Sequence, residues 1–167
     1  MKWIIVLVAV LVILVSLVVG IGMLLPIKHR VSASVNLPVS AEKLWQTMTD
    51  FSAYPSWRTG VMSVAQLADA NGHAVWQEVD RHGESIPYET LASISGRRLV
   101  RRIANPDLPF GGSWTFELAE VTNGTTLTLT EEGEVYHPVY RFVSRFLMGQ
   151  SKNIESYLSD IRVRLSK

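Results

Sequence analysis

The chain has 167 residues, 47% hydrophobic and 19% charged, and contains no cysteine, which excludes disulfides, thiolate nucleophiles and zinc–sulfur sites. Residues 1–30 hold three basic and no acidic residues, so the 13 basic and 15 acidic residues that follow give residues 31–167 a formal charge of −2. A mildly acidic domain with scattered charge is a poor match for nucleic acid, because phosphate binding needs a concentrated basic surface.

The first predicted element is an uncharged apolar run, Trp3–Leu25. As a helix it would be about 34 Å long, enough for a hydrocarbon core of about 30 Å. We therefore expect residues 3–25 of an anchor segment 1–30 to cross a membrane once, in a bacterial inner membrane. A cleaved signal peptide is the alternative, but its apolar region is usually shorter. Basic charge on both flanks leaves the side of the soluble part open.

Residues 31–167 are long enough for one domain with one core. Apolar and polar residues alternate over 31–37, which predicts a half-buried strand that Pro38 ends. Ser40 is placed to cap a helix that carries Leu44, Trp45 and Met48 on one side. An aromatic-rich turn or short second helix is expected over residues 51–58.

Six further strands are predicted over residues 61–68, 73–81, 86–95, 99–104, 113–121 and 125–136. Asn71-Gly72 and Asn123-Gly124 are hairpin signals between them. After Pro138 apolar residues recur at three, four and seven positions, which predicts one long helix that Gly149 interrupts. Strand and helix do not alternate, so the predicted fold class is α+β, with a curved seven-stranded antiparallel sheet wrapped around the long C-terminal helix.

Three stretches of this sequence resemble the START-like, helix-grip superfamily, also called SRPBCC or polyketide cyclase/dehydrase and lipid-transport proteins. They are LPVSAEKLWQTMTDFSAYPSWR (Leu37–Arg58), DLPFGGSWTFEL (Asp107–Leu118) and the terminal FVSRFLMGQSKNIESYLSDIRVRL. The resemblance covers essentially all of residues 31–167 and implies a ligand-binding domain with a cavity between sheet and last helix. It does not imply one activity, since members include lipid carriers, hormone receptors, cyclases and chaperone activators.

Aromatic side chains and one arginine are candidates for lining this cavity, because ligand pockets are mostly apolar with a few polar groups. The predicted ligand-binding residues are Trp57, Trp76, Tyr88, Arg101, Trp114, Phe116 and Phe146. Ordinary core packing explains the tryptophans Trp57, Trp76 and Trp114 equally well. The segments 54–58 and 107–112 mix aromatics with turn formers and are the expected rims of the pocket.

The densest basic cluster consists of Arg97, Arg98, Arg101 and Arg102. One interpretation is an arginine at the pocket wall that holds an acidic headgroup. The favoured interpretation is a solvated sheet face with cross-strand ion pairs to Glu117, or to Glu131 and Glu132.

No cofactor and no metal site are expected. Glu131 and Glu132 are neighbours on a strand and point to opposite faces, so we expect a surface ladder of acidic residues that includes Glu134. The histidines are far apart, lack ligand spacing and are expected at the surface; they are His29, His73, His82 and His137. No catalytic residue is assigned, because the hydrolase, P-loop and dinucleotide-binding fingerprints are absent.

The leading hypothesis is a membrane-anchored carrier or sensor for a hydrophobic small molecule or lipid, with no nucleic-acid partner and any protein partner left open. The alternative is an enzyme of the cyclase or dehydratase kind. It requires a cavity tyrosine, arginine or glutamate, such as Tyr88, Arg101 or Glu117, to point inward. A third hypothesis is a membrane-tethered interaction domain whose core is filled.

Overall fold

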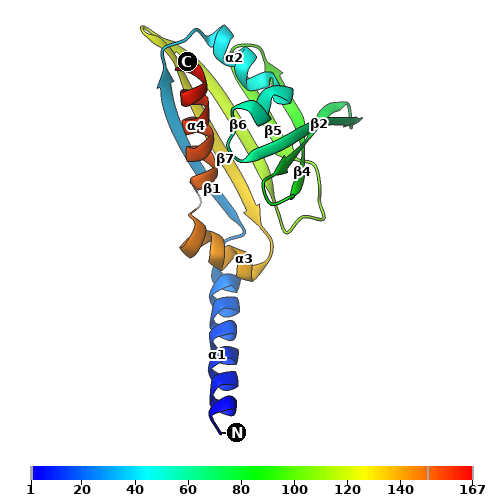
Figure 1. Cartoon of the computed structure of the whole chain (residues 1–167), viewed down its shortest axis with the longest axis vertical. Helices are drawn as coiled ribbons and strands as arrows, with labels where there is room; N and C mark the ends of the chain where they lie inside the picture. The colour runs from blue at the N-terminus through cyan, green and yellow to red at the C-terminus, as the bar shows by residue number, and fades with distance from the viewer. Residues whose placement is uncertain (1, 150, 167) are drawn as a thin grey trace.

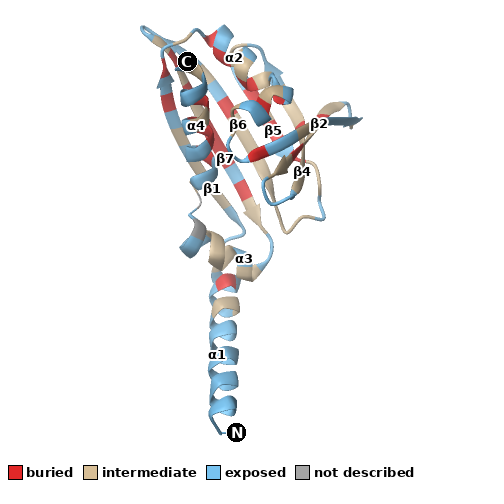
Figure 2. Cartoon of the chain, in the orientation of Figure 1, coloured by how far each residue is buried: buried red, intermediate tan, exposed pale blue. Residues whose placement is uncertain are grey.

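The computed structural model describes residues 2–149 and 151–166, and it consists of one projecting helix and one α+β domain (Figure 1). The projecting helix, α1 (Lys2–Leu24), leaves most of its side chains exposed (Figure 2). It is long and apolar enough to cross a membrane, although an N-terminal signal sequence would pass the same test.

A seven-stranded sheet forms the domain, and every neighbouring pair of strands is antiparallel. Its strands are β1 (Lys28–Leu37), β2 (Val61–Ala70), β3 (His73–Asp80), β4 (Ser85–Ile94), β5 (Arg98–Ile103), β6 (Phe110–Val121) and β7 (Gly124–Val135). The spatial order is β1-β7-β6-β5-β4-β3-β2, and the sheet curves around the C-terminal helix (Figure 1). The predicted fold class is therefore confirmed.

The turn between β2 and β3 follows its sequence signal. Asn71 and Gly72 have φ angles of 53° and 80°, so both central residues are left-handed. Such a turn matches the twist of the flanking strands, and asparagine and glycine adopt it at low cost. Gly124 at the start of β7 approaches the Leu37 carbonyl so closely that a Cβ would overlap it.

Two short helices connect β1 to β2 at one end of the sheet. Helix α2 (Ala41–Thr49) begins after Ser40, whose side chain accepts a hydrogen bond from the Lys43 amide at 3.3 Å. A 3-10 helix, η1 (Phe51–Ser56), follows directly, with Asp50 as its N-cap. These elements carry Met48, Phe51 and Tyr54 into the core.

The C-terminal segment is helical but is not one long helix. It consists of α3 (Pro138–Val143), a π-helical turn η2 (Ser144–Met148) and α4 (Lys152–Leu165). Gly149 has a φ of 78°, which ends the first part. The apolar repeat was expected to form one buried face, and this is correct only for α4, because Leu147 lies exposed while Ile154, Leu158 and Ile161 are buried.

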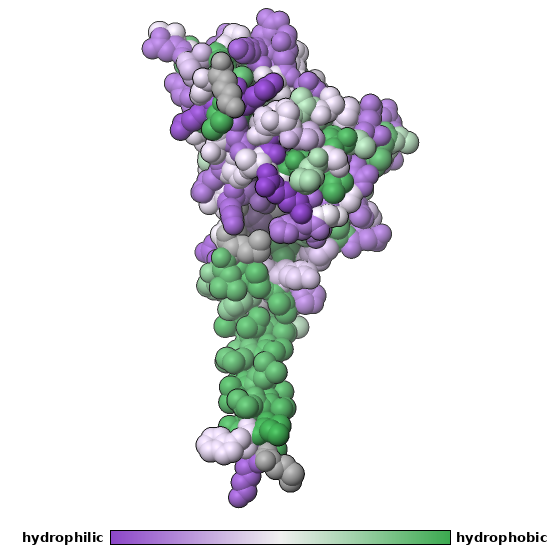
Figure 3. Space-filling view, viewed as in Figure 1, coloured by the Kyte–Doolittle hydropathy of each residue, from purple (hydrophilic) through white to green (hydrophobic). Residues whose placement is uncertain are grey.

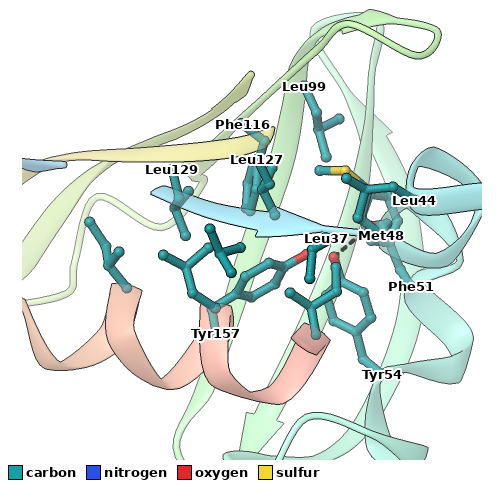
Figure 4. Packing of buried hydrophobic residues seen from close by; sticks show 14 of the residues in the cluster. Leu37, Leu44, Met48, Phe51, Tyr54, Leu99, Phe116, Leu127, Leu129 and Tyr157 are labelled. Carbon is teal, nitrogen blue, oxygen red and sulfur yellow. Dashed lines mark hydrogen bonds between the residues drawn. The ribbon is translucent and has the colours of Figure 1, made fainter. Parts of the chain in front are cut away.

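The core lies between the concave face of the sheet and the helices α2 and α4 (Figures 2 and 4). In one part of it, aliphatic side chains from β1 and β7 meet Ile154 and Ile161 of α4. In the other part, near β3, β4 and β5, buried charges replace the aliphatic residues.

Candidate functional site

Arg101 is the centre of the polar part of the core. On β5 it pairs with Trp114 of β6 and Thr90 of β4, so its side chain points to the concave face together with Leu99. It is only 4% exposed. Its Nη1 donates a hydrogen bond to Oε1 of Glu78 at 2.5 Å.

A second arginine, Arg58, pairs with the other carboxylate oxygen of Glu78. Arg58 Nη1 lies 2.6 Å from Glu78 Oε2. Glu78 follows Trp76 by two positions on β3, so both side chains point inward. Arg58 lies two residues after the end of η1, where its amide donates to the Tyr54 carbonyl at 2.8 Å. The two guanidinium groups and one carboxylate carry a formal net charge of +1 inside the domain.

Aromatic rings surround the two guanidinium groups. The Arg101 Cζ atom lies 4.3 Å from the ring centroid of Phe51 and 4.8 Å from that of Tyr88. The Arg58 Cζ atom lies 4.8 Å from the Tyr54 centroid and 5.1 Å from the Tyr157 centroid. Cation–π contacts of this kind stabilise a desolvated cation, so the rings offset part of the cost of burial.

The tyrosines of this site are held in the neutral form. Burial raises the pKa of the Tyr54, Tyr88 and Tyr157 hydroxyls, and the Glu78 carboxylate raises that of Tyr88 further. Burial alone would lower the pKa of Arg58, but the Glu78 carboxylate and the neighbouring tyrosines raise it. At neutral pH the site therefore offers cationic donors and neutral hydroxyls, which suits an anionic or hydrogen-bond-accepting group.

Several buried polar atoms at this site have no hydrogen-bond partner within residues 2–149 and 151–166. They are Arg101 Nε, Arg101 Nη2, Thr90 Oγ1, Trp57 Nε1 and Tyr157 Oη. Most buried polar groups in proteins are paired, and leaving one unpaired costs about 1–3 kcal/mol. Unpaired donors on a buried arginine are what a site needs in order to bind an acceptor.

A second polar group lies beside the first. Trp114 Nε1 donates to Glu131 Oε2 at 3.1 Å, and His29 Nε2 lies 3.4 Å from Glu131 Oε1. Burial raises the pKa of the Glu131 carboxyl, and its bonds to Trp114 and His29 oppose that rise. The Trp114 ring packs edge-on against Tyr88, with centroids 5.5 Å apart, which joins the two groups.

Six of the seven predicted ligand-binding residues lie around this polar core. Trp76 packs on Phe51, while Trp57 and Phe116 both pack on Tyr157 of α4 (Figure 4 shows Tyr157 and Phe116). Tyr88, Arg101 and Trp114 belong to the contacts described above. Phe146 lies apart, because it belongs to η2, where it is 58% exposed and contacts Phe142.

The structure corrects the interpretation favoured for the arginines at Arg101 only, since the other three are exposed as expected. Arg101 is buried on the inner face and pairs with Glu78, whereas Arg102 points to the opposite face, where its Nη2 lies 2.7 Å from Glu89 Oε1. The strand pattern could not decide this, because both faces of 99–104 carry apolar residues. The expected partner Glu117 is exposed, next to Arg98 in register.

His29 and Glu131 were expected at the surface, and both expectations are wrong. Glu131 has the same parity as Leu127 and Leu129 on β7, which places it on the concave face. His29 covers Gly133, where a Cβ would overlap the imidazole ring. The alternation of apolar residues along β7 could have predicted that Glu131 points inward. The two-residue spacing of Trp76 and Glu78 on β3 could have predicted the same for Glu78. Glu132 is exposed as expected.

The space around the two arginines is occupied by side chains. Two surface hollows lie elsewhere: one of about 440 Å³ is bordered by Pro38–Ser40 and Glu120–Gly124, and one of about 200 Å³ lies beside α2 and Trp57. Neither is lined by Arg101 or Glu78. Within the described residues, no group of three or more histidines and acidic residues is placed to hold a metal ion.

Comparison with known proteins supports the fold described above. A START superfamily protein from Mycobacterium smegmatis superposes with a TM-score of 0.66 at 19% identity, over 83% of this chain and 97% of that one. The Zhui aromatase/cyclase from Streptomyces sp. R1128 gives 0.66 at 15% identity, over 83% and 94%. The di-domain aromatase/cyclase BexL gives 0.67 at 13% identity, over 89% of this chain and 53% of BexL.

A search of the curated proteins finds no match. At these identities the solved structures establish the fold alone. The sequence itself matches one family over residues 28–156, which cover β1 to the first part of α4. The chain therefore belongs to the polyketide cyclase / dehydrase and lipid transport family.

Proposed function

We propose that this chain is a membrane-anchored binding protein for an apolar molecule that carries one anionic or hydrogen-bond-accepting group, such as a fatty acid or an acidic lipid. The observation that supports this most strongly is Arg101, a buried guanidinium with two unpaired donor atoms and an aromatic shell. A planar guanidinium binds a carboxylate or phosphate through two parallel hydrogen bonds.

This structure represents a closed form of the site, in which the Glu78 carboxylate occupies the place that we propose for the acidic group of the ligand. It accepts from Arg58 on one oxygen and from Arg101 on the other, so both arginines are engaged by the protein's own carboxylate. Aliphatic residues at these positions would make the folded state at least as stable, because buried ion pairs seldom stabilise more than apolar residues of similar volume. This cost supports a binding role over a purely structural one.

Opening requires the segment 58–59, which follows η1, to move. Arg58 lies on this segment with its side chain 23% exposed, so it can leave Glu78 for water without crossing the core. The segment is held to α4 by two hydrogen bonds from the Thr59 amide and hydroxyl to Asp160 Oδ2, at 2.8 and 3.0 Å. The helix η1 stays in place, because Phe51 and Tyr54 are buried in the core. Short mobile loops over binding sites commonly act in this way.

The anchor gives the binding protein a source of ligand. Helix α1 would hold the domain at the bilayer, where fatty acids and lipids concentrate. The sequence assigns residues 1–30 to the anchor and residues 31–167 to the binding domain, and residues 28–30 join the domain as the start of β1. This supports a carrier or sensor of membrane lipids over a binder of water-soluble metabolites.

An enzyme of the cyclase or dehydratase kind is the second candidate. It is favoured by the inward positions of Tyr88 and Arg101, since an arginine can polarise a carbonyl while a neutral tyrosine donates a proton. The Glu131 and His29 pair would add a proton acceptor within the same layer of side chains. Conversion of a bound ligand to a product of different mass would support this candidate.

The test is native mass spectrometry with lipid extraction on the full-length protein in nanodiscs. We expect an apolar molecule with an acidic group to co-purify, and Arg101→Met to reduce its occupancy. Charged hydrogen bonds contribute about 1.5–3 kcal/mol, so the reduction should be tenfold or more. Arg102→Met is the matched control, because Arg102 is the next residue on β5 and points to the opposite face.

Circular dichroism on each variant separates lost binding from lost folding. Equal occupancy in wild type, Arg101→Met and Arg102→Met would show that Arg101 does not hold the ligand. An empty wild-type protein that also takes up no added fatty acid would contradict the binding role and support an interaction domain with a filled core.

A further inference from the structure

We propose that the segment Pro138–Met148, which comprises α3 and η2, lies in the lipid headgroup layer of the membrane that α1 enters. We call it the interfacial segment. The proposal rests on the membrane anchoring proposed above, but it is independent of the ligand site. Its occupant is the bilayer surface itself, and it would fix the height and tilt of the domain above the membrane.

The first observation is that the interfacial segment is joined rigidly to the end of α1. Gly22 is buried against Pro138, and a Cβ at Gly22 would overlap the Pro138 carbonyl. Arg141 Nη1 donates to the Leu25 carbonyl at 2.9 Å, and Arg141 Nη2 donates to the Tyr136 carbonyl at 3.1 Å. Figure 1 shows α3 lying across the end of α1. A bilayer spanned by α1 would therefore reach the interfacial segment.

The second observation is the apolar surface of this segment. Tyr140, Phe146 and Leu147 are 52%, 58% and 73% exposed. At the end of α1, Met23 and Leu24 are also exposed, at 67% and 88%. In Figure 3 the apolar surface of α1 continues up to the junction with the domain, where it ends against polar side chains. Large exposed apolar patches on proteins mark interaction sites, membranes included.

The third observation is charge. Residues 136–154 contain no acidic residue, whereas Arg141, Arg145 and Lys152 are basic. Short helical segments with aromatic and leucine side chains beside basic ones lie in the plane of the membrane surface, where they contact anionic headgroups. Aromatic residues are also enriched at this depth. The segment is too short to cross the bilayer by itself, so it is placed at the interface.

The test uses single-cysteine variants, since the chain has no cysteine of its own. The full-length protein is reconstituted in vesicles of phosphatidylcholine and phosphatidylglycerol, and a nitroxide is attached at Leu147→Cys. Power-saturation electron paramagnetic resonance then compares collisions with oxygen, which enters the bilayer, and with a water-soluble nickel complex. Two control sites are labelled in the same way.

One control is Leu14→Cys in α1, which reports insertion of the anchor. The other is Ile94→Cys on β4, which is an exposed position. In the strand register Ile94 lies opposite Arg98, and Arg98 lies opposite Glu117. Ile94 is therefore far along the sheet from Val135, the end of β7 that leads to α3. We expect the label at 147 to collide with the nickel complex several-fold less than the label at 94, at a depth shallower than that of the label at 14.

Three outcomes would overturn the proposal in distinguishable ways. If the label at 147 is as accessible to nickel as the label at 94 while the label at 14 is in the bilayer, the anchor stands and the interfacial segment does not. If the label at 14 is itself in water, the premise of anchoring fails. Dipolar broadening of the spectrum of the label at 147 would show that a second copy of the chain, and not the bilayer surface, contacts the interfacial segment. This result also overturns the proposal.

Discussion

The concave face of the sheet has two unlike parts. Near β1 and β7, Leu37, Leu127 and Leu129 belong to one buried apolar cluster with Ile154 and Ile161 of α4. Near β3 and β5, the same face carries Glu78 and Arg101, equally buried. The first part needs no further explanation, because apolar burial stabilises the fold. The second costs free energy, and this difference supports our proposal that the second part binds the ligand.

The largest effect is expected from breaking the charged part. Glu78→Ala leaves Arg101 buried without its carboxylate, and removal of one partner from a buried ion pair typically costs about 3–5 kcal/mol. Urea unfolding of the domain in the full-length protein measures the change. Glu78→Leu combined with Arg101→Met should recover most of that loss, since the fully buried arginine is then gone and Arg58, which is 23% exposed, can turn to water. A loss below about 1 kcal/mol for Glu78→Ala would show that water reaches the cluster.

A similar loss of stability in the apolar part should leave ligand binding intact. Leu127→Ala removes a fully buried side chain and is expected to cost about 2–5 kcal/mol. Ligand occupancy below the melting temperature should match that of wild type. Leu67→Ala, on the exposed face of β2, is the control and should change stability by less than about 0.5 kcal/mol. Loss of ligand in Leu127→Ala would mean that the two parts are not separable.

A smaller effect is expected where the two parts meet. Tyr54 Oη donates to the Met48 carbonyl at 2.7 Å, and this contact ties η1 to α2 (Figure 4). Tyr54→Phe keeps the ring but removes this bond, at a cost of about 1 kcal/mol in thermal unfolding. Tyr140→Phe, at an exposed position, is the matched control. Equal melting temperatures for both variants would show that the hydroxyl contributes nothing.

The smallest expected effect is a change in how the melting temperature depends on pH. Burial raises the pKa of Glu131 above 4.5, so the folded state holds this proton more tightly than the unfolded state does. The contribution of Glu131 to stability is therefore complete at low pH and falls as pH rises from 4.5 through the raised pKa. Glu131→Gln cannot ionise but can still accept from Trp114. Its melting temperature relative to wild type should rise across this window.

Glu132→Gln is the matched control, because Glu132 is the next residue on β7 and is exposed on the opposite face. His29 contacts Glu131, so the same series is repeated in a His29→Gln background. A difference for Glu131→Gln that shrinks as pH rises would contradict the assigned direction of the pKa shift.

Most of the fold could be predicted from the sequence, because alternation and turn residues are local signals. Asn71-Gly72 marked its hairpin, and the alternation of 31–37 marked its strand. The structure begins that strand earlier, at Lys28, since the backbone there pairs with Glu134 of β7. The break between Met148 and Lys152 depends on what each half packs against, so periodicity alone missed the separation of α3 from α4.

The site was less predictable. Tyr88, Arg101 and Trp114 could be proposed from residue type, but which arginine points inward depends on strand parity, and Leu99 to Ala104 is apolar on both faces. The pairing of Glu78 with Arg58 and Arg101 joins residues 20 and 23 positions apart. Nothing local in the sequence indicates such a contact, because it is set by the pairing of β3, β4 and β5.

The most direct test of the proposed site offers full-length protein in nanodiscs equal amounts of oleic acid and oleyl alcohol and measures both bound species by native mass spectrometry. The two molecules share a chain and differ in the group that Arg101 would hold. The account predicts that the acid is retained tenfold or more over the alcohol, a preference that Arg101→Met abolishes. Equal retention of both molecules, or retention of neither, would contradict it.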